Sequence, residues 1–133
     1  MKTVSTCAVA SVASMILALA PTPGQSALEE SPCRLLLDAV PAAFGRCATL
    51  EVPENYAAPE GRKIELFFAR IPALTGDPAP DPFLLINGGP GGSAVDLYLQ
   101  ARAAFDEIRR ERDIVLLDQR GTGRSLAVCT MPP

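Results

Sequence analysis

The stretch FLLINGGPGGS, residues 83–93, joins a short apolar run to a turn that contains four glycines around one proline. An apolar run of this length, bounded by polar residues, is typical of a strand that is buried on both faces of a parallel sheet. Glycines remove side chains where the backbone bends sharply, and they leave N–H groups exposed beside the start of a helix. The turn can therefore bind a phosphate or an oxyanion that develops during a reaction.

A helix and a second buried strand are predicted downstream of this turn. Apolar residues recur there at steps of three and four and form one stripe: Val95, Tyr98, Ala101, Phe105 and Ile108. Ser93 followed by Asp96 matches a capping box at the start of this helix. A second apolar run, residues 114–117, follows the helix. Strand, turn, helix and strand in this order predict a βαβ unit, so the expected fold class is α/β.

Two antiparallel strands are expected upstream of the βαβ unit. Apolar and polar residues alternate at residues 49–52 and 63–68, which is the pattern of strands, and the segment 54–61 between them is typical of a hairpin loop. The connector DPAPDP, residues 77–82, cannot be helical, because each proline also restrains the residue before it. The sequence thus predicts two antiparallel strands followed by the βαβ unit.

The first 26 residues are expected to be a secretory signal peptide. Lys2 precedes thirteen uncharged residues, 8–20, and prolines and small residues follow, up to a cleavage site after Ser26. The alternative is a membrane anchor, but a span needs about 20 apolar residues and this run is shorter. We therefore expect a secreted chain without a stable membrane span, in which residues 27–133 form the domain.

Histidine is absent from the 133 residues. A Ser-His-Asp or Cys-His hydrolase needs an imidazole to move a proton, so this chain alone cannot assemble either site. A histidine-ligated metal site is excluded with it, and neither a metal nor a cofactor is expected. The net charge is −3, from 12 basic and 15 acidic residues, and lacks the basic excess of a protein that binds nucleic acid.

Removal of Cys7 with the signal leaves three cysteines in an oxidising compartment: Cys33, Cys47 and Cys129. Cys33 and Cys47 flank a segment with Pro41 and Gly45, so we expect them to close a short loop, with a stabilisation of about 3 kcal/mol. The alternative is three free buried thiols. If the pair forms, Cys129 has no partner within the secreted chain.

Two motifs resemble those of a known enzyme family. Residues 87–93, NGGPGGS, resemble the H-G-G-P-G-G loop of the prolyl-iminopeptidase branch of the α/β-hydrolases, and residues 118–125, DQRGTGRS, resemble its D-Q-R-G-x-G-x-S motif. With residues 47–53 and the signal, the chain is similar to the secreted tripeptidyl-aminopeptidase-like serine peptidases, from roughly Cys33 to Cys129. The resemblance implies acyl transfer from a peptide substrate.

The resemblance also implies roles for residues of both motifs. The backbone N–H of Gly89 would be one donor of the oxyanion hole, the set of donors that stabilises the negative oxygen of the transition state. Asn87 stands where the family has a histidine. The residues that would support the loop, or let a substrate approach it closely, are Gly88, Pro90, Gly91, Gly92, Asp118 and Arg120.

In this family the nucleophile elbow, the acid and the histidine follow the matched region in chain order. The chain has no Gly-x-Ser-x-Gly segment and no histidine. Residues 27–133 are therefore expected to form the amino-terminal part of an α/β-hydrolase domain that ends before the nucleophile elbow and is inactive alone. Ser93 and Ser125 are interpreted as a helix cap and a turn residue.

Two other functions remain possible on the sequence. Gly89-x-Gly91-x-x-Ala94 between a strand and a helix, with Asp118 after the next strand, also fits a dinucleotide-binding fingerprint of the Rossmann type. Against this, Pro90 removes a backbone N–H within the turn, and Asp118 lies beyond the usual spacing of about 20 residues. The third possibility is a secreted non-catalytic module that binds an anion or a peptide carboxylate at the loop.

Overall fold

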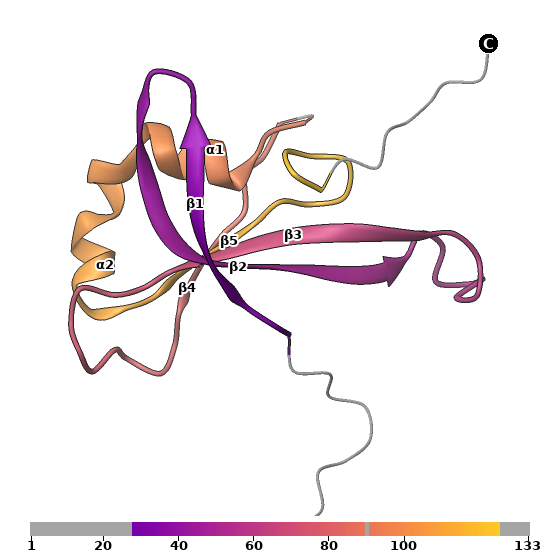
Figure 1. Cartoon of the computed structure of the whole chain (residues 1–133), viewed down its shortest axis with the longest axis horizontal. Coiled ribbons are helices and arrows are strands. Elements are labelled where there is room, and N and C mark those ends of the chain that lie inside the picture. Colours follow the sequence, from indigo (N-terminus) through magenta and orange to yellow (C-terminus); the bar gives the residue numbers. More distant parts are fainter. Residues whose placement is uncertain (1–27, 90, 126–133) are drawn as a thin grey trace, which may run out of the picture.

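A computed structural model describes residues 28–89 and 91–125 (Figure 1). These residues form a mixed sheet of five strands in the order β1-β2-β3-β5-β4. The elements along the chain are β1 Ser31–Leu37, β2 Val40–Pro53, β3 Lys63–Ile71, β4 Phe83–Leu85, α1 Ala94–Gln100, the 3-10 helix η1 Arg102–Phe105, α2 Asp106–Glu111 and β5 Ile114–Leu117. The architecture is α/β, as predicted. The expected signal peptide, Pro90 and Cys129 lie outside the described residues.

The segment between Cys33 and Cys47 is a β-hairpin and not the loop expected from the sequence. β1 and β2 pair antiparallel around a turn at Asp38 and Ala39, where Ala39 has a φ of 59°. The predicted disulfide between Cys33 and Cys47 is present, with Cα atoms 5.7 Å apart. Three antiparallel strands therefore precede β4, where two were predicted.

β2 and β3 continue beyond the rest of the sheet as a long two-stranded arm, residues 49–67 with their connecting loop (Figure 1). The predicted hairpin loop closes it, with the N–H of Glu54 donating to the carbonyl of Arg62 at 2.8 Å. Gly45 lies where β2 approaches β3, and a Cβ there would lie 2.5 Å from the carbonyl oxygen of Arg70. A glycine that favours a loop in the sequence thus serves the close approach of two strands.

The predicted βαβ unit is present, because β4 and β5 pair in parallel with the helical segment between them. The expected single helix is divided at Ala101, which has a φ of −112° and a ψ of 25°. No glycine or proline occurs at this break. The 3-10 turn brings the ring of Phe105 within 5.6 Å of Tyr98 and 6.2 Å of Phe83, centroid to centroid.

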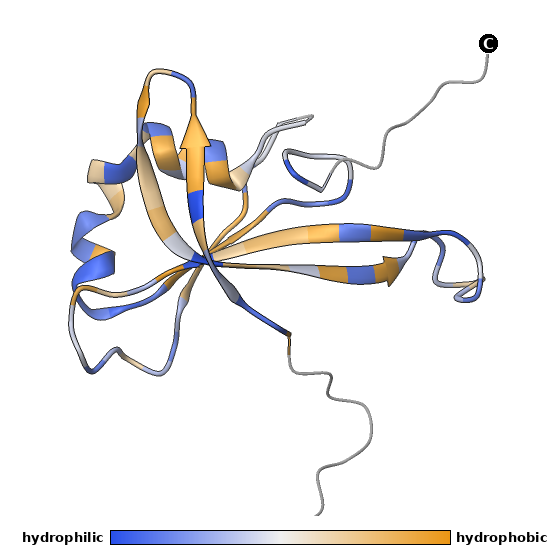
Figure 2. Cartoon of the chain, in the orientation of Figure 1, coloured by the Kyte–Doolittle hydropathy of each residue, from blue (hydrophilic) through white to orange (hydrophobic). Residues whose placement is uncertain are grey.

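The helices lie against one face of the sheet (Figure 1). On that face, Val95, Tyr98 and Leu99 of α1 pack against strand residues that include Ile114 and Leu116. The hydropathy colouring shows long apolar stretches in β2 and β3 as well (Figure 2). In the described part of the chain, no helix is long and apolar enough to cross a membrane.

The other face of the sheet is open, which corrects the expectation that both apolar runs are buried on both faces. In β5, buried residues alternate with half-buried ones. In β4, Leu84 is 52% exposed, and Ile86 after it is 44% exposed. Local composition predicts an apolar run, whereas burial on the second face depends on an element that the described residues do not supply.

Candidate active-site loop

The glycine turn lies directly after β4, at the carboxyl end of the parallel pair. Gly89 and Gly91 have φ values of 81° and 82°, in the left-handed region that favours glycine. Apart from its chain neighbours, a Cβ on either residue, or on Gly88, would meet no atom of the described residues within 4 Å, so the described part of this surface is open to an approaching group. The N–H of Gly89 donates to no other described residue. The predicted donor is thus compatible with an external acceptor.

Asn87 closes the turn with its side chain. Its Nδ2 donates to the carbonyl oxygen of Ser93 at 3.1 Å, which joins the two ends of the glycine segment. Gly92 fits beneath this bridge, because a Cβ there would lie 2.8 Å from Asn87 Nδ2 and 2.6 Å from the carbonyl oxygen of Gly88. The sequence predicts no role for Asn87. In the structure, its amide joins the two ends of the turn.

Asp118 lies at the base of the turn and is fully buried. Its Oδ1 accepts from Ser93 Oγ at 3.0 Å and from the N–H of Ala94 at 2.8 Å. Its Oδ2 accepts from the N–H of Arg124 at 2.9 Å. One carboxylate therefore joins the glycine turn, the start of α1 and the DQRGTGRS segment. Ser93 caps α1 as predicted, because its Oγ accepts from the N–H of Asp96 at 3.1 Å.

This arrangement bears on the dinucleotide alternative. In that interpretation, the N-terminal end of α1 would hold a pyrophosphate, and Asp118 would accept from a ribose hydroxyl. Instead, the carboxylate of Asp118 occupies the first N–H groups of α1 and has no exposed surface. The geometry therefore disfavours a dinucleotide site.

The segment after β5 is fastened to β3 and to α1. Ser125, which is buried, donates its Oγ–H to the carbonyl of Asp118 at 2.6 Å and accepts from the N–H of Phe67 at 2.7 Å. Gly123 has a φ of 46°, and a Cβ there would lie 2.7 Å from Ser93 Cβ and would collide with the Asp118 carboxylate. Both residues of the motif thus serve the packing around Asp118.

Arg124 was not singled out from the sequence, although it stands within the motif. Its Nη1 donates to Asp96 Oδ1 at 3.2 Å, and its Nη2 donates to the carbonyl of Leu36 at 3.0 Å. The guanidinium therefore links α1 to the β1–β2 hairpin. It also lines an open cavity of about 360 Å³, which is bounded by Leu36, Leu37, Asp38, Asp96, Gly123 and Arg124.

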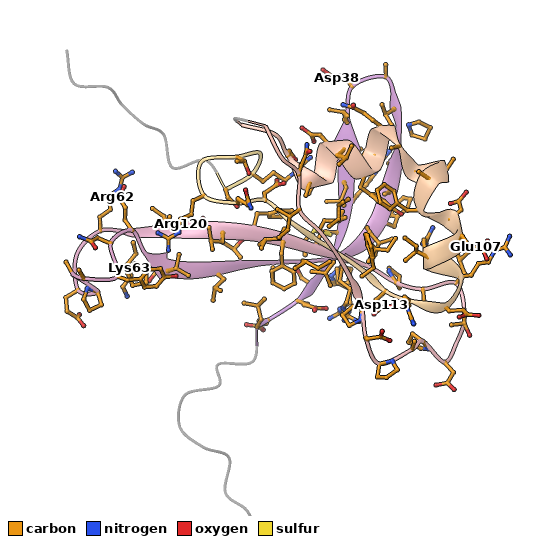
Figure 3. The ribbon with its side chains drawn as sticks, turned by 180° about the vertical axis from the view of Figure 1, so that it is seen from behind. Asp38, Arg62, Lys63, Glu107, Asp113 and Arg120 are labelled. Atoms are coloured by element: carbon orange, nitrogen blue, oxygen red, sulfur yellow. A yellow bond between two sulfur atoms is a disulfide. The ribbon has the colours of Figure 1, made fainter. Side chains whose placement is uncertain are left out.

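Arg120 lies away from the glycine turn that it was expected to support. Its Nη1 donates to the carbonyl of Glu54 at 2.9 Å, and its guanidinium lies 4.8 Å from the ring centroid of Tyr56. Figure 3 shows Arg120 beside the arm, in the region of Arg62 and Lys63. Its observed contacts thus fix the β2–β3 loop.

An ion-pair cluster of Glu30, Arg70 and Asp113 lies on the sheet. Arg70 Nε donates to Glu30 Oε2 at 3.1 Å, and Arg70 Nη1 donates to Asp113 Oδ2 at 3.0 Å. The hydrogen bonds from Arg70 hold the pKa of Glu30 below its ordinary value of 4.5, and those to Glu30 and Asp113 raise the pKa of Arg70. Across residues 28–89 and 91–125, no three acidic or cysteine side chains gather as a metal site would require.

The chain is similar to known proteins over part of the length of those proteins. The chain is 40% identical over 97 residues to a protein named as a hydrolase from Mycobacterium bovis and to Carboxylesterase B from Mycobacterium tuberculosis. Each match covers 70% of this chain and 18% of the relative. No protein-family model matches the chain.

Proposed function

We propose that this chain is the amino-terminal, oxyanion-loop part of a secreted serine hydrolase that cleaves residues from the amino terminus of peptides by acyl transfer. The glycine turn carries this proposal, because Gly89 is exposed, its N–H has no acceptor among the described residues, and a buried carboxylate fixes the turn. The relatives, which are named as a hydrolase and a carboxylesterase, support the hydrolase assignment. The resemblance of both motifs to the tripeptidyl-aminopeptidase-like group supports a peptide substrate.

The chemical role of the turn is to stabilise charge. As a nucleophile attacks a carbonyl, negative charge develops on its oxygen, and a preformed N–H donor stabilises that charge by about 3 to 4 kcal/mol. Positive φ values at Gly89 and Gly91 shape the backbone, and Asn87 and Asp118 hold the ends of the turn. The donor therefore needs little rearrangement during the reaction.

The 133 residues contain neither a histidine to serve as the general base nor a Gly-x-Ser-x-Gly segment to supply the nucleophile. The proposal accordingly assigns the nucleophile, the general base and its acidic partner to the part of such a hydrolase that corresponds to the remaining length of the relatives. The 133 residues contribute the oxyanion donor and the scaffold that holds it.

A chimera tests the hydrolase assignment. The matched segment of M. tuberculosis Carboxylesterase B is replaced by the corresponding residues of this chain, and hydrolysis of a p-nitrophenyl ester is measured. We expect turnover, and Gly89→Pro, which removes the N–H and also cannot adopt the φ of 81° that shapes the turn, lowers kcat/KM by about 100-fold to 1000-fold. Gly76→Pro, in an open loop, leaves kcat/KM within about threefold.

Two results would contradict the assignment. One is a chimera that folds, with a cooperative thermal transition, and hydrolyses no ester. The other is a Gly89→Pro chimera with unchanged kcat/KM. A thermal midpoint close to that of the parent shows that any loss in the Gly89 variant is local to the turn.

A carboxylic ester is the alternative to a peptide as the substrate, because the M. tuberculosis relative is named Carboxylesterase B. The two are separated by comparing a tripeptidyl p-nitroanilide with a free amino terminus and the p-nitrophenyl ester. A preference of this chain for peptides raises the ratio of their kcat/KM values in the chimera above that of Carboxylesterase B itself. A lower ratio favours the ester.

A further inference from the structure

The tip of the β1–β2 hairpin, the start of α1 and the DQRGTGRS segment bound the open cavity of about 360 Å³. We call it the hairpin cavity, and its lining residues are Leu36, Leu37, Asp38, Asp96, Gly123 and Arg124. Its volume lies within the range of about 300 to 1000 Å³ that small-molecule sites occupy. Figure 3 shows Asp38 at the tip of the hairpin. The proposed oxyanion donor, Gly89, is not among the lining residues, so the hairpin cavity is a separate space.

The hairpin cavity is fixed to the glycine turn through one carboxylate. Asp118 Oδ2 accepts from the N–H of Arg124 at 2.9 Å, and Asp118 Oδ1 accepts from the N–H of Ala94 at 2.8 Å. The side chain of Arg124 in turn donates to Asp96 and to the carbonyl of Leu36. The wall of the cavity and the end of the glycine turn therefore have a defined relative position, which two subsites for one substrate require.

The charges of the lining favour a cation. The lining has two carboxylates, of Asp38 and Asp96, and one guanidinium, of Arg124. The guanidinium already donates to Asp96 and to the carbonyl of Leu36. Asp38 is exposed, and none of the ion pairs among the described residues includes it. The carboxylate of Asp38 is thus the charge with which a ligand can pair.

Leucine side chains supply the apolar part of the hairpin cavity. Leu36 is 55% exposed, and Leu37 beside it is half-buried against the core. A ligand that covers Leu36 removes apolar surface from water, which favours binding. The lining therefore suits a ligand that carries a positive charge next to an apolar group, because such a ligand pairs with Asp38 and covers Leu36 at the same time.

We propose that the hairpin cavity binds the amino-terminal residue of a peptide, with its ammonium group beside Asp38 and Asp96 and an apolar side chain against Leu36. An ammonium group has three N–H donors, and its hydrogen bonds to carboxylates are charge-assisted. The choice of a peptide amino terminus rests on the proposed function, whereas the preference for an ammonium beside an apolar group follows from the lining. The side chain of lysine is the other peptide source of such an ammonium.

Ligand binding to the 133-residue chain tests this inference without any turnover. L-leucinamide carries an ammonium group beside an apolar side chain, and N-acetyl-L-leucinamide lacks that charge. Nα-acetyl-L-lysinamide carries its ammonium at the end of the side chain instead. Each compound is titrated into the isotope-labelled chain at about pH 6, where α-amino groups are protonated. NMR measures the Kd and the backbone signals that shift.

We expect L-leucinamide to bind with a Kd of about 1 to 10 mM and to shift the signals of residues 36–38, 96 and 123–124. The two acetylated compounds bind at least about tenfold more weakly, because each lacks the ammonium beside the leucine side chain. Asp38→Asn weakens binding of L-leucinamide by about threefold to fivefold, as expected for one exposed ion pair. Asp81→Asn is the matched control, because it removes the same charge at a side chain that is 72% exposed and lies outside the cavity, and it leaves the Kd unchanged.

Four outcomes overturn the inference. They are L-leucinamide that shifts no signal of the lining residues, equal affinity for L-leucinamide and its acetylated form, equal effects of Asp38→Asn and Asp81→Asn, and tighter binding of the lysine derivative, which would assign the site to a side chain. The spectrum of each variant shows whether it is folded. Expected binding together with an inactive Carboxylesterase B chimera keeps the ammonium site and removes the proposed function, and an active chimera without binding of L-leucinamide does the reverse.

Discussion

The carboxylate of Asp118 gathers donors from two motifs that are about 25 residues apart in the chain. It has no exposed surface, and it accepts hydrogen bonds from backbone N–H groups as well as from the Ser93 hydroxyl. Hydrogen bonds to a buried charge contribute more than those between neutral groups. At the residue scale, the geometry of the glycine turn therefore depends on a side chain that lies outside it.

Substitution of Asp118 by Asn tests this dependence. The amide has a similar shape, but its NH2 group would face N–H donors, so we expect the free energy of unfolding to fall by about 2 to 3 kcal/mol. Asp81→Asn is the control, because the Asp81 side chain is 72% exposed, and we expect a change within about 0.5 kcal/mol. Urea unfolding measures both. Equal effects would contradict the role of Asp118.

Gly123→Ala adds one methyl group beside the same carboxylate. The positive φ and the contact with Asp118 and Ser93 both oppose it, so we expect a loss of about 2 to 3 kcal/mol. Gly76→Ala places the same methyl group in open space and changes stability by less than about 1 kcal/mol. Thermal unfolding distinguishes the two. A neutral Gly123→Ala would show that the packing around Asp118 is loose.

Glu30 gives the protein a defined response to acid. Its pKa is lower in the folded chain than its ordinary value of 4.5, because Arg70 donates to its carboxylate. The folded state binds fewer protons than the unfolded state in this range, so the contribution is present above about pH 4.5 and is lost as the pH falls through the lowered pKa.

Glu30→Gln should therefore lower stability near neutral pH by about 1 kcal/mol and leave it almost unchanged at low pH. Urea unfolding from pH 7 to pH 3 measures the difference between the variant and the parent. Glu60→Gln, at an exposed position in the β2–β3 loop, should give no such convergence. A constant difference at all pH values would refute the assignment to Glu30.

At the element scale, the sequence predicted the elements whose local pattern agrees with their final environment. The βαβ unit, the arm and the Ser93 cap were predicted, because periodicity and capping are local properties. The β1–β2 hairpin was not, since Pro41 and Gly45 favoured a loop. Pro41 lies near the start of β2. Gly45 is needed because a side chain there would collide with the carbonyl of Arg70, and no local sequence pattern predicts that contact.

For the same reason, local sequence patterns did not predict which groups the arginine side chains bind. Arg120 and Arg124 stand in one motif, yet one binds the β2–β3 loop and the other joins α1 to the β1–β2 hairpin. These directions depend on how segments far apart in the sequence pack. The motif therefore predicted the position of the candidate site, and the fold decided which of its residues hold the glycine turn.

The Cys33–Cys47 disulfide belongs to the hairpin as an element. Its loss in Cys33→Ser/Cys47→Ser should lower stability by about 3 kcal/mol, because the unfolded chain gains freedom over a 14-residue separation. A reductant should lower the urea midpoint of the parent and leave that of the variant unchanged. A parent that is insensitive to the reductant would contradict this contribution.

For the whole molecule, the 133-residue chain should hydrolyse neither p-nitrophenyl esters nor tripeptidyl p-nitroanilides. The reason is chemical, since a serine needs a base and the chain has no imidazole. Continuous absorbance assays measure this. Turnover that disappears in Ser93→Ala or in Ser125→Ala, but not in Ser31→Ala, would disprove it.

The buried Asp118 has a consequence for the end of a catalytic cycle. A hydrolase of the proposed kind releases a carboxylic acid, which is ionised at neutral pH. The first N–H groups of α1 would otherwise attract that anion, but they are already satisfied by a fixed negative charge. The N–H groups at the start of α1 that could hold a carboxylate product or a phosphate are thus already occupied, whereas the N–H of Gly89 is not, so product inhibition and inhibition by phosphate should both be weak.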